Sequence, residues 1–493
     1  MRKLNGKKIK LFSLLLCVLF ATAALAGCNG GGRTGEPPYD VEIITEGVSY
    51  AESESRTPLP YASYSPAGLA DDVLPIMGFG GPRPRAASEG NALLQWNRPE
   101  VYQAIAEAGV NIMNMAAMVN YDVGNSGFVN SIIDAAWEAG LKTVVQVQAM
   151  INIESGVAAP VSAMTQILTE LEKRPGFGGI YGKDEPQAVY FETIQTAEAN
   201  WKKAAEAVGS DALIYWNAAG IGAPNTYYTG GLTVSMTYDE YLDYYVGIRP
   251  KYLISGHYPF FKDRETNGDV RSDYFAGISA LRAKADGAGI PFWMHTQVGG
   301  NFDAVLDENE GNRRNTEGEF HWNNNTLLAY GAKGLAPFPL VFPLEWMTEG
   351  ADWTANGLLN PNGTKNIWWH HMKKDAVQIK AIQSVLMKSK NVGVIAHGDS
   401  PAPVPERDVV GDGWRELQSV SGDSALIGCF DYNGKTAFYA VNNSTEKDGA
   451  LIALNFDKKY GYDVIQRGET LSVAATRLPL KLNAGEGALV VLK

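Results

Sequence analysis

The sequence predicts a (β/α)8 TIM barrel followed by a small C-terminal antiparallel β-sandwich domain. Between residues 73 and 390, short apolar runs bounded by Gly and Pro alternate eight times with amphipathic helical stretches. After residue 390 the pattern changes to alternating runs separated by turn signals such as Asn433-Gly434. The 493 residues are also too many for one ordinary core, and 45% hydrophobic with 19% charged residues is typical of a globular protein.

Each element of the barrel is predicted from this alternation. The expected strands are 74–80, 110–118, 142–150, 178–184, 212–217, 252–260, 291–297 and 334–342. The expected helices are 99–108, 128–139, 161–173, 190–208, 238–248, 274–288, 320–331 and 366–387. Strands that alternate with helices in this way form parallel sheets, and eight repeats match a barrel. The alternative is a doubly wound open sheet, but Gly78-Phe79-Gly80-Gly81-Pro82 lacks the GxGxxG spacing of its phosphate turn.

The segments on either side of the barrel are predicted to lack its strand–helix alternation. The C-terminal strands are expected at 425–432, 435–442, 450–456, 462–465 and 487–492. The chain is therefore divided into a signal peptide (1–27), a tether with an irregular entry segment (28–72), a barrel (73–390) and a β-sandwich (391–493). Such a terminal domain either binds sugar or caps the barrel, and capping is the role we expect.

The N-terminus has the pattern of a secretory signal. A basic start precedes the apolar run 11–25, and small residues follow in Leu25-Ala26-Gly27-Cys28. This tetrapeptide resembles the lipobox of bacterial lipoproteins, which implies that Cys28 is lipidated and becomes the mature N-terminus. The alternative is an ordinary signal peptide with a chance cysteine. We expect a protein outside the cytoplasm, lipid-anchored to a bacterial cell membrane, with the Gly-rich residues 29–35 as a flexible tether.

Charge and cysteine content exclude several classes. The net charge of −12 argues against a general nucleic-acid binder, which carries a basic face. The three cysteines have no metal-site spacing and form no disulfide framework. Adjacent His370 and His371 point about 100° apart on a helix, so they are not expected to share a metal. Neither a metal nor an organic cofactor is expected.

The C-terminal strand ends carry an unusual concentration of amides, aromatic rings and imidazoles. In a barrel these ends line one rim, where ligands bind. Flat aromatic faces beside amides suit pyranose rings, which have apolar faces and hydroxyl edges. The expected substrate-binding residues are Asn114, Gln148, Trp216, Asn217, His257, Tyr258, Trp293, His295 and Gln297.

The sharpest feature is Gly182-Lys183-Asp184-Glu185-Pro186, which places two carboxylates at the end of the fourth strand. It resembles clan A glycoside hydrolases, (β/α)8-barrel enzymes in which strand 4 ends in Asn-Glu and the Glu is the general acid/base. The resemblance implies a carbohydrate substrate, Glu185 as acid/base and Asp184 at the Asn position. We expect the pKa of Glu185 to be raised by partial burial and by its carboxylate neighbour, since the acid must be protonated.

The sequence departs from that family at strand 7, where the nucleophilic Glu is replaced by His295-Thr296-Gln297. Three accounts stay open. The second carboxylate is Glu345 after strand 8, or Asp303 or Asp307 after strand 7. Alternatively, Asp184 and Glu185 resemble the pair of N-acetylhexosaminidases, which implies attack by the substrate's own acetamido group. In the third account the barrel is inactive and only binds glycans.

Overall fold

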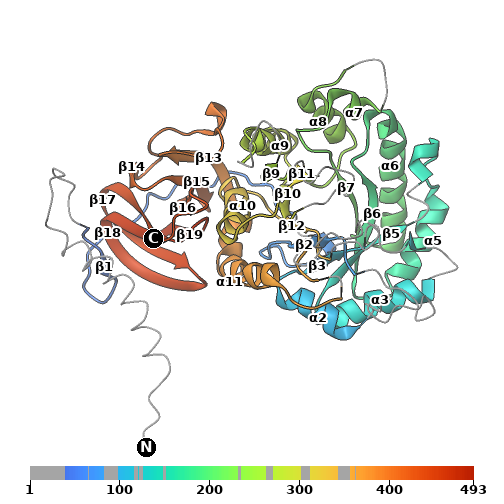
Figure 1. Ribbon diagram of the computed structural model, residues 1–493, viewed down its shortest axis with the longest axis horizontal. Helices are drawn as coiled ribbons and strands as arrows, with labels where there is room; N and C mark the ends of the chain where they lie inside the picture. The colour runs from blue at the N-terminus through green and yellow to red at the C-terminus, as the bar shows by residue number, and fades with distance from the viewer. Residues whose placement is uncertain are drawn as a thin grey trace, which may run out of the picture.

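The computed structural model of the chain consists of a parallel β/α part and a C-terminal antiparallel sheet (Figure 1). It describes residues 39–64, 66–82, 98–115, 120–121, 126–147, 152–230, 235–262, 270–300, 311–341, 356–360 and 362–493. The predicted signal sequence and Cys28 lie outside these ranges. The helices within them include none with the length and apolar character needed to span a membrane.

In the described part of the chain, eight parallel strands alternate with helices as predicted, and a further two-residue strand, β4 (Asn120–Tyr121), pairs in parallel with the third of them. The strands are β2 (Met77–Phe79), β3 (Ile112–Asn114), β5 (Lys142–Val147), β6 (Phe177–Asp184), β7 (Leu213–Asn217), β8 (Leu253–Ser255), β10 (Phe292–Gln297) and β12 (Leu335–Phe338). The helices that follow them are α2 (Pro99–Glu107), α3 (Ser126–Glu138), α5 (Val161–Leu171), α6 (Phe191–Val208), α8 (Tyr238–Gly247), α9 (Tyr274–Ala288), α10 (Glu317–Ala329) and α11 (Ile367–Met387).

The eight strands surround one interior but do not form an unbroken hydrogen-bonded barrel. One sheet has the order β2-β3-β5-β6-β7 and the other β8-β10-β12, all in parallel register. Single parallel bridges join the two sheets at both seams, Ala218 to Ser255 and Ile76 to Leu335. An apolar cluster fills this interior, and every one of the eight strands contributes at least one side chain to it, including Met77, Tyr215 and Trp293. The barrel prediction is therefore confirmed in strand order and direction, while the ladder itself is interrupted twice.

Tyr64 and residues 66–69 close the N-terminal end of the strands. The short helix η1 (Pro66–Gly68) places Ala67 in the interior cluster. A Cβ added at Gly178, near the start of β6, would lie 2.7 Å from that of Ala67, so the two backbones fit together closely. Because this end is filled, the strand ends open to a ligand are the C-terminal ones.

The C-terminal domain is one eight-stranded antiparallel sheet that bends around its own core. Its order is β1-β18-β17-β19-β16-β15-β13, with β14 paired to β17. The strands are β13 (Ser389–His397), β14 (Leu417–Gly422), β15 (Ala425–Tyr432), β16 (Lys435–Asn442), β17 (Ala450–Gln466), β18 (Glu469–Leu482) and β19 (Gly487–Leu492). The long strand β17 pairs with β14 over its first half and with β19 over its second, across a register shift after Asn455. The antiparallel prediction is confirmed, but one continuous sheet takes the place of two separate ones.

Residues 40–56 of the entry segment belong structurally to the C-terminal domain. Strand β1 (Glu42–Ile43) adds to the edge of β18, and the Asp40 carboxylate accepts bonds from the backbone N–H groups of Thr476 and Arg477. Further along, the Arg56 guanidinium lies 2.8 Å from the Glu416 carboxylate. Residues 40–56 thus contact the C-terminal sheet before the chain enters the barrel.

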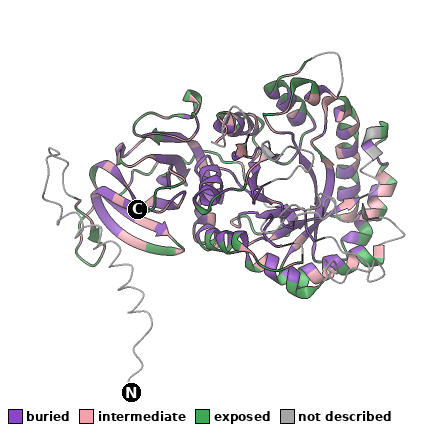
Figure 2. Ribbon diagram, in the orientation of Figure 1, coloured by how far each residue is buried: buried purple, intermediate pink, exposed green. Residues whose placement is uncertain are grey.

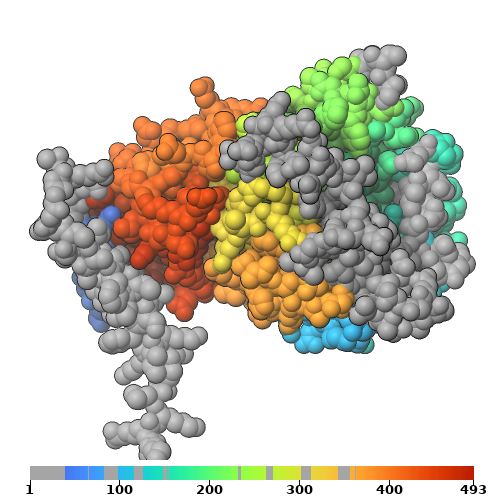
Figure 3. All heavy atoms as spheres, viewed as in Figure 1, coloured from blue at the N-terminus to red at the C-terminus, as the bar shows by residue number. Residues whose placement is uncertain are grey.

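Helix α10 joins the two parts and is buried along nearly its whole length (Figure 2). The Asn325 side chain donates to the carbonyl of Gly485 at 2.9 Å and accepts from the Tyr439 hydroxyl at 2.5 Å. The Trp322 indole donates to Asn443 at 2.9 Å. Figure 3 shows the C-terminal domain packed directly against this side of the barrel. These buried polar contacts hold the domain in a defined position.

Candidate active site

The acidic pair lies at the C-terminal end of β6, where the backbone is held in an uncommon conformation. Asp184 pairs in register with Asn217 at the end of β7, and the Glu185 N–H donates to the Asn217 carbonyl at 2.7 Å. Glu185 has φ 43°, in the left-handed region that a side chain with a Cβ rarely adopts, and Pro186 follows it. Such strain persists where the surroundings over-determine it, and it is typical of functional sites.

Asp184 is oriented by two donors that share one of its oxygens. The Tyr181 hydroxyl donates to Oδ1 at 2.8 Å and the Asn217 amide donates to the same atom at 2.7 Å. Among the described residues no hydrogen bond to Oδ2 occurs. The residue is exposed, although protein atoms crowd its carboxyl group. That crowding raises the pKa of Asp184, and the bonds from Asn217 and Tyr181 oppose the rise.

Glu185 has the properties expected of an acid that is protonated near neutral pH. Burial, and then the charge of Asp184, raise the pKa of Glu185 to about 7. The Tyr227 hydroxyl donates to Glu185 Oε2 at 3.0 Å, which opposes the rise. Burial, followed by the charge of Glu185, raises the pKa of Tyr227, so its hydroxyl keeps its proton and acts as a donor. The expectation of a raised Glu185 pKa from burial and from Asp184 is confirmed.

A group of aromatic rings lies beside this pair. Phe79 contacts Tyr181, His295 and Phe338 edge-on at centroid distances of 5.4, 5.1 and 5.5 Å. Tyr258 stacks on Phe338 at 5.9 Å, and both rings are partly exposed. Burial, and next the charges of Glu185 and Asp184, raise the pKa of Tyr258, so its hydroxyl keeps its proton at neutral pH. The rim therefore offers apolar ring surface beside two carboxyl groups.

Several predicted site residues are engaged elsewhere in the fold. His257 Nε2 lies 3.0 Å from the Asp273 carboxylate, so its ring faces α9. The Gln297 amide donates to the carbonyls of Phe260, Gly299 and Arg313 and holds these loops together. Asn114 is fully buried.

His295 faces the aromatic group but has no hydrogen-bonding side chain among the described residues. Burial lowers the pKa of His295 to about 4, so its ring is neutral at neutral pH.

The two predicted Trp platforms lie in the core. Trp216 is 2% exposed, points outward from β7 and donates to the Glu198 carboxylate at 3.0 Å. Trp293 is fully buried and stacks on Tyr252 inside the barrel at 4.6 Å. Neither ring has a free face for a sugar. Gln148, Glu345, Asp303 and Asp307 lie outside the described residues.

Sequence reasoning missed Tyr227 completely. It lies on α7 (Asn225–Thr229), a short helix in the connection after β7 that was not expected. Phe79, Tyr181 and Phe338 stood at predicted strand ends without an assigned role. The Pro224-Asn225-Thr226 sequence, a helix-start signal after a strand, is the one local feature that could have pointed to α7.

No protein-family model and no curated protein sequence matches the chain. Among solved structures, it is similar to a β-galactosidase from the psychrophilic Marinomonas ef1 at 9% identity and TM-score 0.44, over 65% of this chain and 62% of that one. It is also similar to a glycoside hydrolase at 10% identity and TM-score 0.48, over 88% and 98% of the two chains. A glycoside hydrolase family 5 protein from Bacteroides vulgatus gives 10% identity and TM-score 0.46 over 85% and 89%. Function is therefore inferred from the residues around Glu185.

Proposed function

We propose that the protein is a glycosidase that cleaves O-glycosidic bonds of an oligo- or polysaccharide, with Glu185 as general acid/base. The observation that carries the proposal is the Glu185 carboxyl group itself. It stands at the end of the fourth strand, its pKa is raised to about 7, and the Tyr227 hydroxyl holds its Oε2. With Oε2 occupied, the acid proton resides on Oε1, ready to pass to a leaving-group oxygen.

The aromatic group supports a sugar as the substrate. Tyr258 and Phe338 are partly exposed, and Phe338 packs on Phe79, which contacts the Tyr181 ring whose hydroxyl binds Asp184. A pyranose ring has an apolar face that packs on such rings, while its hydroxyls need polar partners like Asn217. In this proposal Tyr258 keeps the stacking role expected from the sequence, and Phe338 takes the role expected of Trp216 and Trp293.

The described residues favour a substrate-assisted mechanism in which Asp184 binds the substrate's 2-acetamido group. Within the described residues Asp184 accepts hydrogen bonds through Oδ1 alone, and in this mechanism Oδ2 accepts the acetamido N–H. Glu185 then protonates the glycosidic oxygen, the bond from C1 to that oxygen breaks, and the acetamido oxygen bonds to C1. In the second step Glu185 takes a proton from water, which attacks C1 and opens the ring intermediate. The alternative two-carboxylate mechanism uses Glu345, Asp303 or Asp307 as nucleophile or base.

Substitution of the pair separates these possibilities. Glu185→Gln should lower the release of reducing ends from a panel of glycans by about 10²–10⁴-fold, the usual contribution of a general acid. Glu206→Gln, on the exposed side of α6, is the matched control. If the wild type binds glycans but releases no reducing ends, the glycosidase proposal fails and a binding protein is favoured.

The role of Asp184 has its own test. Asp184→Asn should suppress cleavage of N-acetylhexosaminides, and thiazoline analogues should inhibit the wild type. Efficient cleavage of substrates with a plain 2-hydroxyl would contradict the acetamido mechanism. A loss of activity in Glu345→Gln equal to that in Glu185→Gln would favour the two-carboxylate alternative.

We also propose that lipid on Cys28 anchors the protein at the outer face of a bacterial cell membrane. The support is the basic start, the apolar run and the Leu-Ala-Gly-Cys sequence before the Gly-rich tether. Cys28→Ala, expressed in a bacterium, should move the protein out of the detergent-soluble membrane fraction. An unchanged membrane fraction would contradict the proposal.

A further inference from the structure

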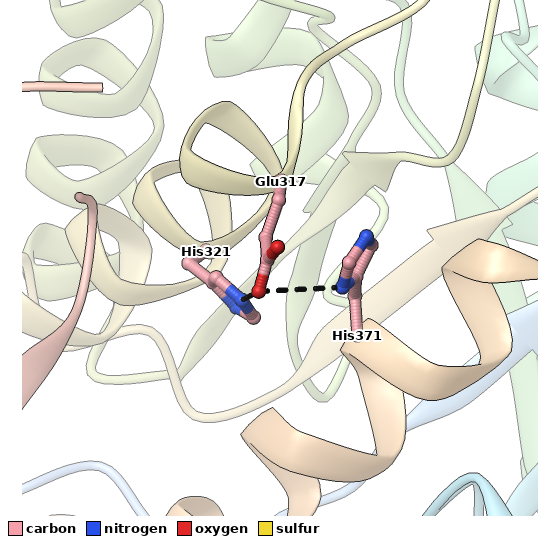
Figure 4. A group of neighbouring side chains, drawn as sticks. All are labelled: Glu317, His321 and His371. Atoms are coloured by element: carbon pink, nitrogen blue, oxygen red, sulfur yellow. Dashed lines mark hydrogen bonds and ion pairs between the residues drawn. The ribbon is translucent and has the colours of Figure 1, made fainter. Parts of the chain in front are cut away.

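Three potential metal ligands face one another between α10 and α11, away from the acidic pair of β6. Glu317 and His321 are four residues apart on α10, so they lie on the same helix face one turn apart. His371 comes from α11 and points toward them (Figure 4). One ligand atom from each residue lies within 4.8 Å of the others. The cluster thus joins two helices that are separated by a strand in the sequence.

The spacing of these atoms is close to that of a tetrahedral metal site. Glu317 Oε1 lies 3.4 Å from His321 Nε2 and 3.7 Å from His371 Nδ1. Bonds of about 2.0–2.1 Å to Zn²⁺ place neighbouring ligand atoms of a tetrahedron about 3.3 Å apart. The two Glu317 distances therefore need shifts of only a few tenths of an ångström. The ligand atoms of His321 and His371 lie within 4.8 Å of each other and must approach by up to about 1.5 Å, which rotation of the two imidazole rings supplies.

A fourth side chain already holds one imidazole in the orientation that a metal requires. His321 Nδ1 lies 2.6 Å from Asp375 Oδ1, and the Asn324 amide donates to Asp375 Oδ2 at 2.7 Å. When a metal ion takes the place of the Nε2 proton, neutral His321 keeps its Nδ1 proton on this bond and offers the lone pair of Nε2 on the side of Glu317. A carboxylate behind a ligating histidine is the usual outer partner in zinc sites.

Burial and charge also suit an ion at this place. His321 and His371 are 4% and 8% exposed, whereas the Glu317 side chain is 55% exposed and leaves a side open to water. The Lys374 ammonium lies 3.2 Å from Glu317 Oε1 and occupies part of this space. Its side chain is 49% exposed, so it can turn into solvent when a cation binds.

We propose that Glu317, His321 and His371 bind a divalent transition-metal ion, with Asp375 as the outer hydrogen-bond partner of His321 and water as the fourth ligand. Two imidazoles and one carboxylate suit Zn²⁺ better than Mg²⁺ or Ca²⁺, which prefer oxygen ligands. The ion fastens α10 to α11 directly beside the C-terminal domain. No local pattern predicts this site, because His371 lies 54 residues from Glu317 and its only neighbouring histidine in the sequence, His370, is not part of the cluster.

The test uses the full chain after treatment with a chelator. Titration with Zn²⁺ by calorimetry should give saturable binding of one ion per chain and a rise in Tm. Co²⁺ should give the intense visible absorption of tetrahedral ligation rather than the weak spectrum of the hydrated ion. Asp375→Asn should weaken Zn²⁺ binding by about 10–100-fold, the usual cost of losing an outer partner.

Variants of the ligands decide the assignment. Glu317→Gln and His371→Ala should each weaken Zn²⁺ binding by more than tenfold and abolish the tetrahedral Co²⁺ spectrum. His370→Ala, an exposed histidine on the same helix, should bind as the wild type does. Because Glu317 is exposed, its variant is expected to fold. Absence of binding to the wild type, equal binding by Glu317→Gln, or an equal loss in His370→Ala would each overturn the proposal.

Discussion

Replacing Glu185 with Gln should stabilise the protein at alkaline pH, independently of any assay for activity. The folded state raises the pKa of Glu185 from 4.5 to about 7, first through burial and then through the charge of Asp184. Folding therefore favours the protonated carboxyl group. The associated stability is fully present below pH 4.5 and is lost as the pH rises through about 7. Gln is neutral at every pH and does not lose this stability.

The magnitude follows from the gap between the two pKa values. Each pH unit of that gap is about 1.4 kcal/mol, which gives an upper bound of ~3 kcal/mol at pH 8 and above. Glu185 is partly exposed, and solvent screening reduces the effect to about 1–2 kcal/mol. For a chain of this size such a change corresponds to roughly 1–4 °C in Tm.

Thermal melting at matched scan rates measures the difference. At pH 8.5 the wild-type Glu185 carboxyl group is ionised, so the Tm of Glu185→Gln should exceed that of the wild type. Near pH 4 the carboxyl group is protonated and the difference in Tm should vanish. Glu206→Gln on α6 reports the effect of the same chemical change at an exposed position. An equal difference at both pH values, or a wild type that is the more stable at alkaline pH, would refute the claim that the fold keeps Glu185 protonated.

Three further substitutions test one contact of the site and two packing features of the barrel. Tyr227→Phe removes a hydrogen bond worth about 1.5–3 kcal/mol to ionised Glu185, so the pKa of Glu185 should rise and the alkaline limb of the kcat/KM profile should move up by about one pH unit or more. An alkaline limb at the wild-type pH would contradict this contact. Lys333→Met leaves the carbonyls at the end of α11 without their buried donor, so the free energy of unfolding measured with denaturant should fall by about 2–4 kcal/mol. An unchanged free energy of unfolding would mean that water replaces the ammonium group. Gly182→Ala would place a Cβ 2.4 Å from the Trp216 ring, so Tm should fall, by an amount equivalent to about 1–3 kcal/mol; an unchanged Tm would show that the ring yields freely.

Local patterns in the chain predicted much of the fold. The eight strand–helix alternations are correct because hydrophobic periodicity reflects the face that each element buries. The long strand β18 was missed, since Pro479 and several charged residues interrupt its apolar pattern. Strand β17 was expected as two strands because the polar residues Asp457, Lys458 and Lys459 stand at its bend. The entry segment shows no pattern of its own, because its strand β1 pairs with residues that come some 430 positions later in the chain.

The sequence by itself determined the order of the barrel elements and placed Asp184 and Glu185 at the end of the fourth strand. Both follow from residues that are neighbours in the chain. Only the tertiary structure decided which side chains surround that pair. It brought Tyr227 to Glu185 from 42 residues away and turned Trp216 outward against α6. It also set His371 beside Glu317 across two helices. Such contacts depend on how twisted strands and helices pack in three dimensions, and no local period in a sequence encodes that packing.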